Sequence, residues 1–329
     1  MGENGVTCEI PYFLGFDGGG SKTECVIASA DGQVLGRSTA GPSNPMRSGF
    51  TRAWFSLSEA ADILLDRRKI TSVDIRGICA GIGGAARNSV ARRLVTFFQR
   101  SFPKADVEVT TDVEIAFEAA FASGEGIVLV AGTGSGAFGR DASGRKERAG
   151  GRGPWFSDEG SGFDIGRRAV AATLLAEENR GPATALNDQL FTFLEIRDWN
   201  SLVDNVSKDP DTLFPRVFPL VAQLADSGDE VSREILSSAA ASLAGLASSV
   251  AEKLGWHGAN HESKVAAHRR VIPIARIGGM HGRSEFFDAA LDTALTQALP
   301  HKKYVDLSMT PAEAAVKIAS RAKGNASSA

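Results

Sequence analysis

The chain has 329 residues, and its 36 lysines and arginines against 39 aspartates and glutamates leave a formal net charge of −3. At ~150 residues per domain this length suggests about two domains, and the slightly acidic balance lacks the basic footprint of a nucleic-acid-binding protein. The three cysteines stand far apart with no Cys-x-x-Cys pair, which argues against a disulfide framework and a zinc ribbon. With neither a signal-peptide pattern nor an apolar run of membrane length, we expect a cytoplasmic protein without nucleic-acid or membrane partners.

Short strands and helices alternate through the first third of the chain. Between Tyr12 and Ser38 we expect three strands, FLGFD, TECVIAS and QVLGRS, joined by turns at Gly18-Gly19-Gly20 and Asp31-Gly32. The apolar spacing then predicts a helix over 48–67, a strand over 75–82, a helix ending at 98 that Asn88 caps, a strand over 107–111 and a helix over 114–122.

The same strand and turn pattern returns at Gly126. Strands IVLVAG, AFGRD and KERAG follow one another, and Gly18-Gly19-Gly20-Ser21 aligns with Gly132-Thr133-Gly134-Ser135. This repeat predicts two similar lobes. Further elements are expected as helices over 161–178, 184–194, 213–226 and 229–254, strand 271–279, helix 284–299, strand 303–307 and a helix from Pro311. The alternation of strands with helices predicts an α/β fold.

The first glycine turn, in FDGGGSKTE, has the composition of a phosphate-binding loop. Three consecutive glycines leave backbone N–H groups open to a phosphate, and the neighbouring hydroxyl and lysine side chains add donors and positive charge. Asp17 at the end of the strand would hold a hydrated Mg²⁺, which keeps waters and needs few carboxylates. An ordinary glycine hairpin is the alternative interpretation. The expected cofactor-binding residues are Asp17, Gly19, Gly20, Ser21, Lys22 and Thr23.

The second glycine turn, AGTGSG, also offers bare N–H groups, together with the hydroxyls of Thr133 and Ser135. Neither turn is a Walker A loop, since serine rather than glycine precedes Lys22. The formal Gly-x-Gly-x-x-Gly match from Gly134 continues into a strand instead of a helix, which argues against a dinucleotide-binding domain. We therefore expect the two turns to clamp the phosphates of a nucleotide. The binding residues of the second turn are expected to be Gly132, Thr133 and Gly134.

Three further segments are candidates for chemistry. Asp112 follows the strand VEVTT, where a carboxylate can act as general base, or else cap the next helix. Asp158 and Glu159, in GGRGPWFSDEGSG, can accept hydrogen bonds from sugar hydroxyls, or else form an acidic first helix turn. Gly278 and Gly279 follow the strand VIPIARI and permit close approach of an adenine or ribose, or else form a simple turn.

Taken in order, these motifs resemble those of the acetate kinase/actin/hexokinase superfamily, and within it the N-acetylglucosamine kinase branch of the BadF/BadG/BcrA/BcrD ATPase family. GFDGGGSKT resembles the phosphate-1 motif, VLVAGTGS the phosphate-2 motif and IGGM the adenosine motif. TTD and SDEGS resemble the catalytic and sugar-loop signatures of the branch. The likeness extends from Phe13 to about Ala319.

The resemblance implies two ribonuclease-H-like, actin-like lobes with ATP and Mg²⁺ in the cleft between them. We expect the N-terminal lobe over 1–112, the C-terminal lobe with helical insertions over 113–310, and a last helix near 311–323 that packs on the first lobe. Asp112 would be the base, and Thr133 and Ser135 would bridge sugar and phosphate. The residues expected around the sugar are Asn44, Gly83, Gly84, Asp112, Thr133, Ser135, Asp158 and Glu159.

The implied activity is ATP-dependent phosphorylation of the 6-hydroxyl of an amino sugar by a homodimer. The serine that the branch carries near Gly83 is missing, and Ala149 stands in place of a cysteine, so glucosamine and N-acetylmuramic acid stay alternatives to N-acetylglucosamine. Other members of the family activate dehydratases through a cysteine-held iron–sulfur cluster, but GIVLVAGTGSG has no cysteine. A non-catalytic, sugar-responsive regulator on the same fold is the rival hypothesis.

Overall fold

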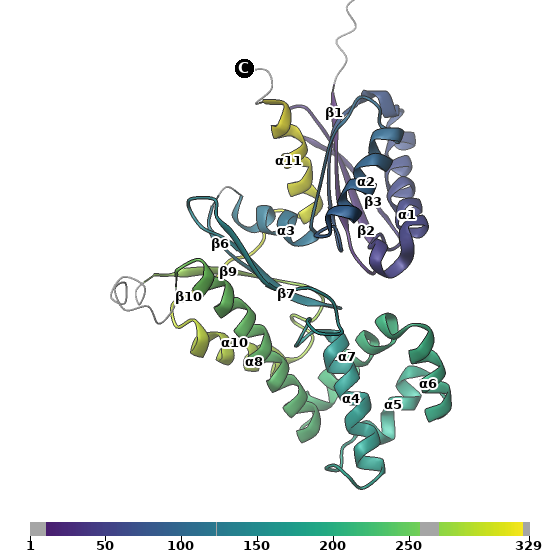
Figure 1. Ribbon diagram of the computed structural model, residues 1–329, viewed down its shortest axis with the longest axis vertical. Coiled ribbons are helices and arrows are strands. Elements are labelled where there is room, and N and C mark those ends of the chain that lie inside the picture. The colour runs from purple at the N-terminus through teal and green to yellow at the C-terminus, as the bar shows by residue number, and fades with distance from the viewer. Residues whose placement is uncertain (1–10, 123, 257–269, 325–329) are drawn as a thin grey trace, which may run out of the picture. The chain divides into compact units, whose positions relative to one another are not determined.

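The chain forms two compact units, each built on one five-stranded sheet. The computed structural model describes residues 11–122, 124–256 and 270–324. Unit 1 comprises Met1–Ser123 and Leu307–Ala329, and unit 2 comprises Gly124–Asp306 (Figure 1). The chain leaves unit 1 only after the helix that begins at Asp112, which the sequence analysis assigned to the second lobe. The mixed strands and helices of both units confirm the α/β class.

The sheet of unit 1 has the strand order β3-β2-β1-β4-β5. Its strands are β1 (Tyr12–Gly18), β2 (Thr23–Ser29), β3 (Val34–Ala40), β4 (Ile75–Ile82) and β5 (Asp106–Thr110). The first three strands form an antiparallel meander, and β1, β4 and β5 run parallel to one another. The carboxyl ends of these three parallel strands therefore share one edge of the sheet. The first glycine turn and the segments at Gly83 and Asp112 all leave the sheet there.

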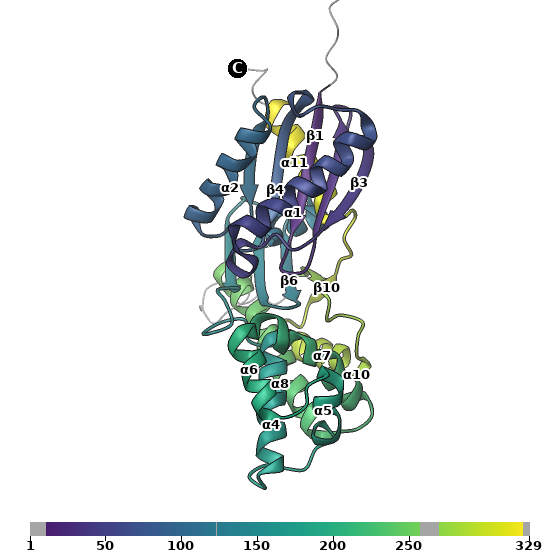
Figure 2. The same cartoon turned by 90° about the vertical axis from the view of Figure 1, so that its right-hand side faces the viewer.

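Helices cover both faces of this sheet. They are α1 (Pro45–Arg68), α2 (Asn88–Ser101), α3 (Asp112–Phe121) and α11 (Pro311–Gly324), with a short 3₁₀ helix at Ser72–Asp74. On one face, Leu57 of α1 and Phe98 of α2 belong to the same buried cluster as Phe16 of β1. On the other face, Phe13 of β1 shares a cluster with Val316 of α11. Figures 1 and 2 both show α11 on the opposite side of the sheet from α1.

The starts of α1 and α2 in unit 1 differ from the sequence-based expectation, and α3 begins at Asp112 rather than at 114. Helix α1 begins at Pro45 rather than at 48, with Asn44 as the N-cap residue, and Gly49 interrupts its helical backbone with a φ of 75°. The apolar periodicity becomes regular only after that interruption. Asn88 does not cap α2, since it is the first helical residue and Arg87 occupies the cap position without a side-chain hydrogen bond.

The sheet of unit 2 has the order β10-β9-β6-β7-β8, which is the order of unit 1 when the strands of each unit are counted from its own first strand. Its strands are β6 (Gly126–Ala131), β7 (Ser135–Arg140), β8 (Lys146–Gly150), β9 (Ile272–Ile277) and β10 (Lys302–Tyr304). Again three strands form an antiparallel meander and two more run parallel to the first. The two meanders found in the sequence are thus a repeat of topology, as expected.

Unit 2 carries most of the helices. They are α4 (Gly162–Glu177), α5 (Leu186–Leu194), α6 (Trp199–Lys208), α7 (Pro210–Asp226), α8 (Glu230–Lys253) and α10 (Glu285–Ala298). Helix α6 was not predicted, although Trp199, Leu202, Val203 and Val206 follow the apolar spacing of a helix. This apolar stripe extends over only about two turns of helix, and Leu202 is its only fully buried residue.

Helix α8 is the central helix of unit 2. Its Ala- and Leu-rich face packs on β6, β7 and β8 and against α4, α7 and α10. Among the described helices, α8 alone is long and apolar enough by length and composition to cross a membrane. Eleven of its residues are nevertheless buried within the protein, including Leu236, Leu243 and Val250. Its apolar composition is therefore explained by packing in the core of unit 2.

Candidate active site

The first glycine turn is an open loop between β1 and β2. It is closed by a hydrogen bond from the Gly19 N–H to the Lys22 carbonyl, 3.0 Å long. The Gly19 carbonyl in turn accepts the N–H groups of Ser43 and Asn44, at 3.1 and 3.0 Å. Gly20, Ser21 and Lys22 remain exposed at the tip. The turn can therefore present N–H groups and the Lys22 ammonium to an anion.

Thr23 differs from its neighbours in this turn. Its side chain is fully buried, and its hydroxyl donates a 2.7 Å hydrogen bond to the Gly41 carbonyl. The expected donation of this hydroxyl to a phosphate conflicts with that geometry, because a hydroxyl has a single proton to give. Thr23 instead fixes the turn to the loop that leads into α1.

Asp17 is the residue before the turn, and its carboxyl is in an unfavourable environment for a negative charge. Burial, helped by the nearby carboxylates of Asp112 and Glu24 and opposed by the charge of Lys22, raises the pKa of Asp17 to about 7. A divalent cation beside such a group would offset its charge. The described residues contain no cluster of three or more metal-ligating side chains, and Mg²⁺ that arrives on nucleotide phosphates needs only one or two carboxylates. Asp17 therefore fits a hydrated Mg²⁺.

Asp112 begins α3 without capping it. The cap is Thr111, whose hydroxyl accepts the Glu114 N–H at 3.2 Å, while the Glu114 carboxylate accepts the Thr111 N–H at 3.4 Å. This reciprocal capping box rules out the alternative role of Asp112 as the helix cap. The Oδ1 atom of Asp112 accepts the Val113 N–H at 3.0 Å. Its Oδ2 atom lies 3.4 Å from the position that a Cβ on Gly83 would take, so it faces the glycines after β4.

The electrostatics of Asp112 suit a proton acceptor. Burial raises the pKa of Asp112 above its usual range, against the opposing effects of its backbone hydrogen bonds and of the Arg47 charge. A carboxylate with a raised pKa is a stronger base, which is the requirement for accepting a proton from a hydroxyl.

Asn44 and the glycine pair after β4 form the wall beside Asp112. The Oδ1 atom of Asn44 accepts the Met46 N–H at 3.0 Å, which caps α1 and orients the amide. Its Nδ2 atom lies 3.0 Å from the position of a Cβ on Gly83, and its Oδ1 atom lies 3.0 Å from that of a Cβ on Gly84. Gly84 also has a φ of 88°. Side chains at these two positions would occupy the space beside Asp112, so the glycines keep that space open for a ligand.

In unit 2, the second glycine turn lies beside the glycine pair after β9. A Cβ on Gly132 would come within 3.7 Å of the Cα of Gly278 and 3.8 Å of the Gly279 nitrogen. Gly278 has a φ of 108°, and a Cβ there would lie 2.2 Å from the Ala131 carbonyl oxygen. The segments that resemble the phosphate-2 and adenosine motifs are therefore neighbours, and only glycine fits at the point where they approach.

The N-terminus of α4 meets the same turn. The Gly132 carbonyl accepts the Gly162 N–H at 2.8 Å, and the Thr133 carbonyl accepts the Phe163 N–H at 3.3 Å. The side chain of Thr133 is partly exposed. Thr133 is therefore the residue of this turn that can offer its hydroxyl to a ligand.

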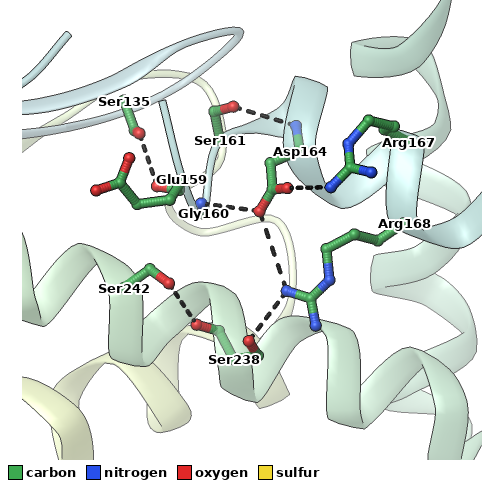
Figure 3. Close-up of polar contacts among 9 residues, drawn as sticks. All are labelled: Ser135, Glu159, Gly160, Ser161, Asp164, Arg167, Arg168, Ser238 and Ser242. Carbon is green, nitrogen blue, oxygen red and sulfur yellow. Dashed lines mark hydrogen bonds and ion pairs between the residues drawn. The ribbon is translucent and has the colours of Figure 1, made fainter. Parts of the chain in front are cut away.

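Ser135 holds the acidic loop before α4 in place (Figure 3). Its side chain is buried, and its hydroxyl donates to the Glu159 carbonyl at 2.7 Å. The Glu159 carboxylate makes none of the contacts drawn in Figure 3, and its side chain is exposed. Ser135 therefore positions the loop, whereas Glu159 presents a free carboxylate.

Asp158 is held in a rare backbone conformation. Its φ is 63°, its side chain is buried, and its carboxylate accepts the Gly153 N–H at 3.2 Å. Residues that adopt such a φ without being glycine need support from their surroundings. Helix α4 starts only at Gly162, with Ser161 as its cap. The alternative role of Asp158 and Glu159 as an acidic first helix turn is therefore wrong.

A polar network that the sequence analysis did not identify supports this loop from α4. Asp164 accepts the Gly160 N–H at 3.1 Å and pairs with Arg167 at 3.2 Å (Figure 3). Arg168 lies 4.0 Å from Asp164 and donates to the Ser238 hydroxyl of α8 at 3.0 Å. The spacing of Asp164 to these arginines, three and four residues apart in a helix, was a signal available in the sequence.

The predicted site residues thus form one group in each unit. Unit 1 brings together the residues from its turn, Asn44, Gly83, Gly84 and Asp112, and unit 2 brings together its turn, the acidic loop and the pair Gly278 and Gly279.

Comparison with known proteins identifies relatives of this chain. A protein of Clostridium acetobutylicum named N-acetylmuramic acid/N-acetylglucosamine kinase is 32% identical over 234 residues, which is 70% of this chain and 76% of that protein. The N-acetyl-D-glucosamine kinase of Dictyostelium discoideum is 28% identical over 325 residues, 94% of this chain and 98% of that protein.

The fold is also found among solved structures. A candidate N-acetylglucosamine kinase from Chromobacterium violaceum superimposes with a TM-score of 0.74 at 22% identity, covering 94% of this chain and 99% of that one. The family model described as the BadF/BadG/BcrA/BcrD ATPase family matches residues 14–319. With a match over nearly the whole chain and a glycine turn at the head of each repeated sheet, this protein belongs to the BadF/BadG/BcrA/BcrD ATPase family.

Proposed function

We propose that this protein is an ATP-dependent amino-sugar kinase that transfers the γ-phosphoryl group of ATP to the 6-hydroxyl of N-acetylglucosamine, glucosamine or N-acetylmuramic acid. The coarser assignment, a sugar kinase that uses ATP, has the support of the family and of relatives named as kinases of such sugars. We expect the enzyme to act in the cytoplasm as a homodimer, which light scattering of the purified protein tests.

The observation that carries the proposal is the environment of Asp112. Its Oδ2 atom faces the open glycine wall of Gly83 and Gly84, beside the amide of Asn44. Thr111 caps the helix, so Asp112 has no structural duty that would occupy its carboxylate fully. We assign Asp112 as the general base that receives the proton of the attacking hydroxyl, with Asn44 as a ligand that orients the sugar.

The nucleotide phosphates are assigned to the exposed tip of the first turn. Gly20, Ser21 and Lys22 would donate to phosphate oxygens, and Asp17 would hold Mg²⁺ through water. The metal ion would neutralise charge on the phosphates when bound. Thr23 contributes by fixing the turn, through its hydrogen bond to the Gly41 carbonyl.

Unit 2 is assigned the adenosine of ATP, a share of the phosphate contacts and contacts to hydroxyls of the sugar. Gly278 and Gly279 would leave room for adenosine, and the turn at Gly132–Gly134 would contribute N–H groups and the Thr133 hydroxyl to the phosphates. Asp158 and Glu159 would accept hydrogen bonds from sugar hydroxyls. Together these groups would position the reactants and balance charge, which is how phosphoryl transfer is catalysed when the protein supplies no covalent intermediate.

The test is ADP release by the purified protein with Mg²⁺, ATP and a panel of glucose, glucosamine, N-acetylglucosamine and N-acetylmuramic acid. We expect slow release with ATP alone and much faster release with at least one amino sugar, and mass spectrometry of the product should show one added phosphate. A rate that stays flat across the panel would reject the kinase and favour a sugar-responsive regulator.

A further inference from the structure

Arg47 is a cation at the unit 1 site that the sequence motifs did not identify. It lies in the first turn of α1, three residues after Asn44, and its side chain is only partly exposed. Its side chain makes no hydrogen bond or ion pair with any residue in the described part of unit 1. A partly buried guanidinium without a partner is unusual, because its donors lose water without a replacement.

The guanidinium of Arg47 is close to the tip of the glycine turn and acts on the carboxylate of Asp112. A Cβ built on Gly20 would lie 3.1 Å from the Cδ atom of Arg47 and 3.3 Å from its Nη1 atom. The charge of Arg47 also acts on the carboxylate of Asp112 and lowers its pKa. Arg47 thus borders both the tip of the glycine turn, where phosphates are assigned, and the proposed base, where the acceptor hydroxyl is assigned.

Gly20, which faces Arg47, has no side chain. A side chain there would press against the arginine, whereas the glycine leaves its Nη1 and Nε atoms free to face a ligand on the turn. Planar guanidinium groups match phosphate oxygens with two parallel hydrogen bonds, which makes arginine the preferred residue for such a contact.

We propose that Arg47 binds the phosphoryl group while it passes from ATP to the sugar. The inference rests on the proposed kinase function and adds a residue to it. In the transfer, the sugar oxygen forms a bond to the γ-phosphorus, the bond from that phosphorus to the bridging oxygen breaks with its electron pair left on ADP, and the hydroxyl proton passes to Asp112. Arg47 stabilises the negative charge on the phosphoryl oxygens during this exchange.

Arg52 provides a comparison within the same helix. Its guanidinium lies over the exposed ring of Phe55, at 6.0 Å from the centroid, and next to Gly41 rather than to the turn tip. The two arginines share a helix and a charge but differ in their distance from the reacting groups. Arg52→Met is therefore a matched control for Arg47→Met.

The experiment compares the wild type with Arg47→Met, Arg47→Lys and Arg52→Met. Methionine keeps much of the length of the side chain without its charge. We expect Arg47→Met to lower kcat by at least about 10²-fold, since arginines that meet a transferring phosphoryl group contribute about 10³–10⁵-fold and here Lys22 shares the charge. Arg47→Lys should recover part of the loss, Arg52→Met should match the wild type, and the dissociation constant for the sugar should not change in any variant.

A second measurement separates this proposal from the kinase assignment. Calorimetry gives the dissociation constants of Mg²⁺ with a non-hydrolysable ATP analogue and with ADP. We expect Arg47→Met to weaken the binding of the analogue more than the binding of ADP, because only the analogue carries the γ-phosphoryl group. This comparison needs no sugar, so it decides the role of Arg47 even if no sugar in the panel is phosphorylated.

Three results would overturn the proposal. One is a kcat within threefold of the wild type in Arg47→Met. Another, which applies if no sugar is phosphorylated, is a ratio of the affinities for the ATP analogue and for ADP that is the same in Arg47→Met as in the wild type. The third is a loss confined to the KM of N-acetylmuramic acid, which would make Arg47 a receptor for the carboxylate of an acidic sugar. A melting curve for each variant verifies that the fold is retained, and Arg47→Lys repeats the test if Arg47→Met does not fold.

Discussion

The two units repeat the same sheet, and the repeat extends to how the glycine turn is held. In unit 1 the first residue of the second strand, Thr23, is buried and donates to the carbonyl of Gly41, in the loop before the first helix. In unit 2 the corresponding residue, Ser135, is also buried and donates to the carbonyl of Glu159, again in the loop before the first helix. A buried hydroxyl therefore anchors the turn in both units.

The backbone of the turns is used in the same way as well. The Gly19 carbonyl accepts N–H groups from the start of α1, and the Gly132 carbonyl accepts the N–H of Gly162 at the start of α4. The charges differ, however. Unit 1 has Asp17 and Lys22 around its turn, whereas the three turn residues of unit 2 carry no charge and follow Ala131. The repeated backbone therefore provides two open glycine turns, while the ionisable groups to which metal binding and proton transfer are assigned, Asp17 and Asp112, are in unit 1.

The largest expected effect is at Asp112, which follows the fifth strand of unit 1 and has no catalytic counterpart assigned in unit 2. Asp112→Asn should lower kcat by about 10²–10⁴-fold, the usual contribution of a general base, while calorimetry shows an unchanged affinity for the sugar. Asp306, which follows the fifth strand of unit 2 and is exposed, gives the control. Asp306→Asn should leave kcat unchanged. A near-normal kcat in Asp112→Asn would reject the assignment of the base and direct attention to Asp158 and Glu159.

The next effect concerns the charge on Asp17 and its dependence on pH. Because its pKa is raised to about 7, the folded protein keeps this proton between about pH 4 and pH 7 while the unfolded chain loses it, so the free energy of unfolding falls as the pH rises through that range. Asn has no proton to lose, so in Asp17→Asn the free energy of unfolding should no longer fall through this pH range. We expect the variant to gain little stability near pH 4 and on the order of 2–4 kcal/mol above pH 7 in the absence of Mg²⁺.

Melting curves of the wild type and Asp17→Asn from pH 4 to pH 8 in a chelator measure this effect. The replacement of Asp306 by Asn serves again as the control, since its carboxyl is exposed. Asp17→Asn should also raise the Mg²⁺ concentration needed for half-maximal activity. A stability difference that is the same at every pH would contradict the buried environment of Asp17.

Removal of either anchoring hydroxyl, that of Thr23 or that of Ser135, should lower the stability of the protein by a similar amount. Thr23→Val and Ser135→Ala each leave a carbonyl without its donor, which costs about 1–3 kcal/mol of stability for a buried group. We expect Thr23→Val to raise the KM for ATP and Ser135→Ala to raise the KM for the sugar, because the loops that they hold are assigned to those substrates. Urea unfolding and steady-state kinetics measure both. Thr51→Val, at an exposed position of α1, should change neither.

The smallest expected effect is at the surface of α4. Arg167 is more than half exposed, and its ion pair with Asp164 should contribute no more than about 1 kcal/mol. Arg167→Gln should therefore leave the melting temperature and the KM for the sugar close to those of the wild type. A large increase in the KM would show that the ion pair of Arg167 with Asp164 is needed to hold the acidic loop in its sugar-binding position.

Much of the fold was predictable because its strands are apolar and its turns are rich in glycine. Strands such as β1 and β4, buried on both faces, appear in the sequence as continuous apolar runs ending in glycine. Elements with weaker burial were harder to find. The short helix α6 has only one fully buried residue, Leu202, and the start of α1 was hidden by the non-helical residue Gly49.

The candidate site was predicted as a set of residue types, but several roles were not. Thr23 and Ser135 have the hydroxyls that a phosphate-binding loop would need, and both are used to hold loops. Arg47 was missed because no motif includes it, and its position next to Gly20 depends on how α1 packs beside the turn. Sequence patterns report which groups are available, whereas their partners depend on contacts between segments far apart in the chain.

The alignment of the two repeats shows the same limit. By sequence, Ser21 aligned with Ser135, because both follow a glycine-rich triplet. The strand registers instead pair Gly18 with Thr23 and Ala131 with Ser135, so the first turn has four residues, the second has three, and Thr23 is the counterpart of Ser135.

The sequence by itself determined the α/β class, the repeated meander and the glycine turns, because these depend on local periodicity and on backbone freedom at single residues. Tertiary structure alone decided that Thr111 rather than Asp112 caps α3, which leaves the Asp112 carboxylate facing Gly83. It also decided the raised pKa values of Asp17 and Asp112, since burial and neighbouring charges come from segments distant in sequence. Hydrogen-bond partners and desolvation are properties of the packed chain, and for that reason the chemistry of this site is readable only in three dimensions.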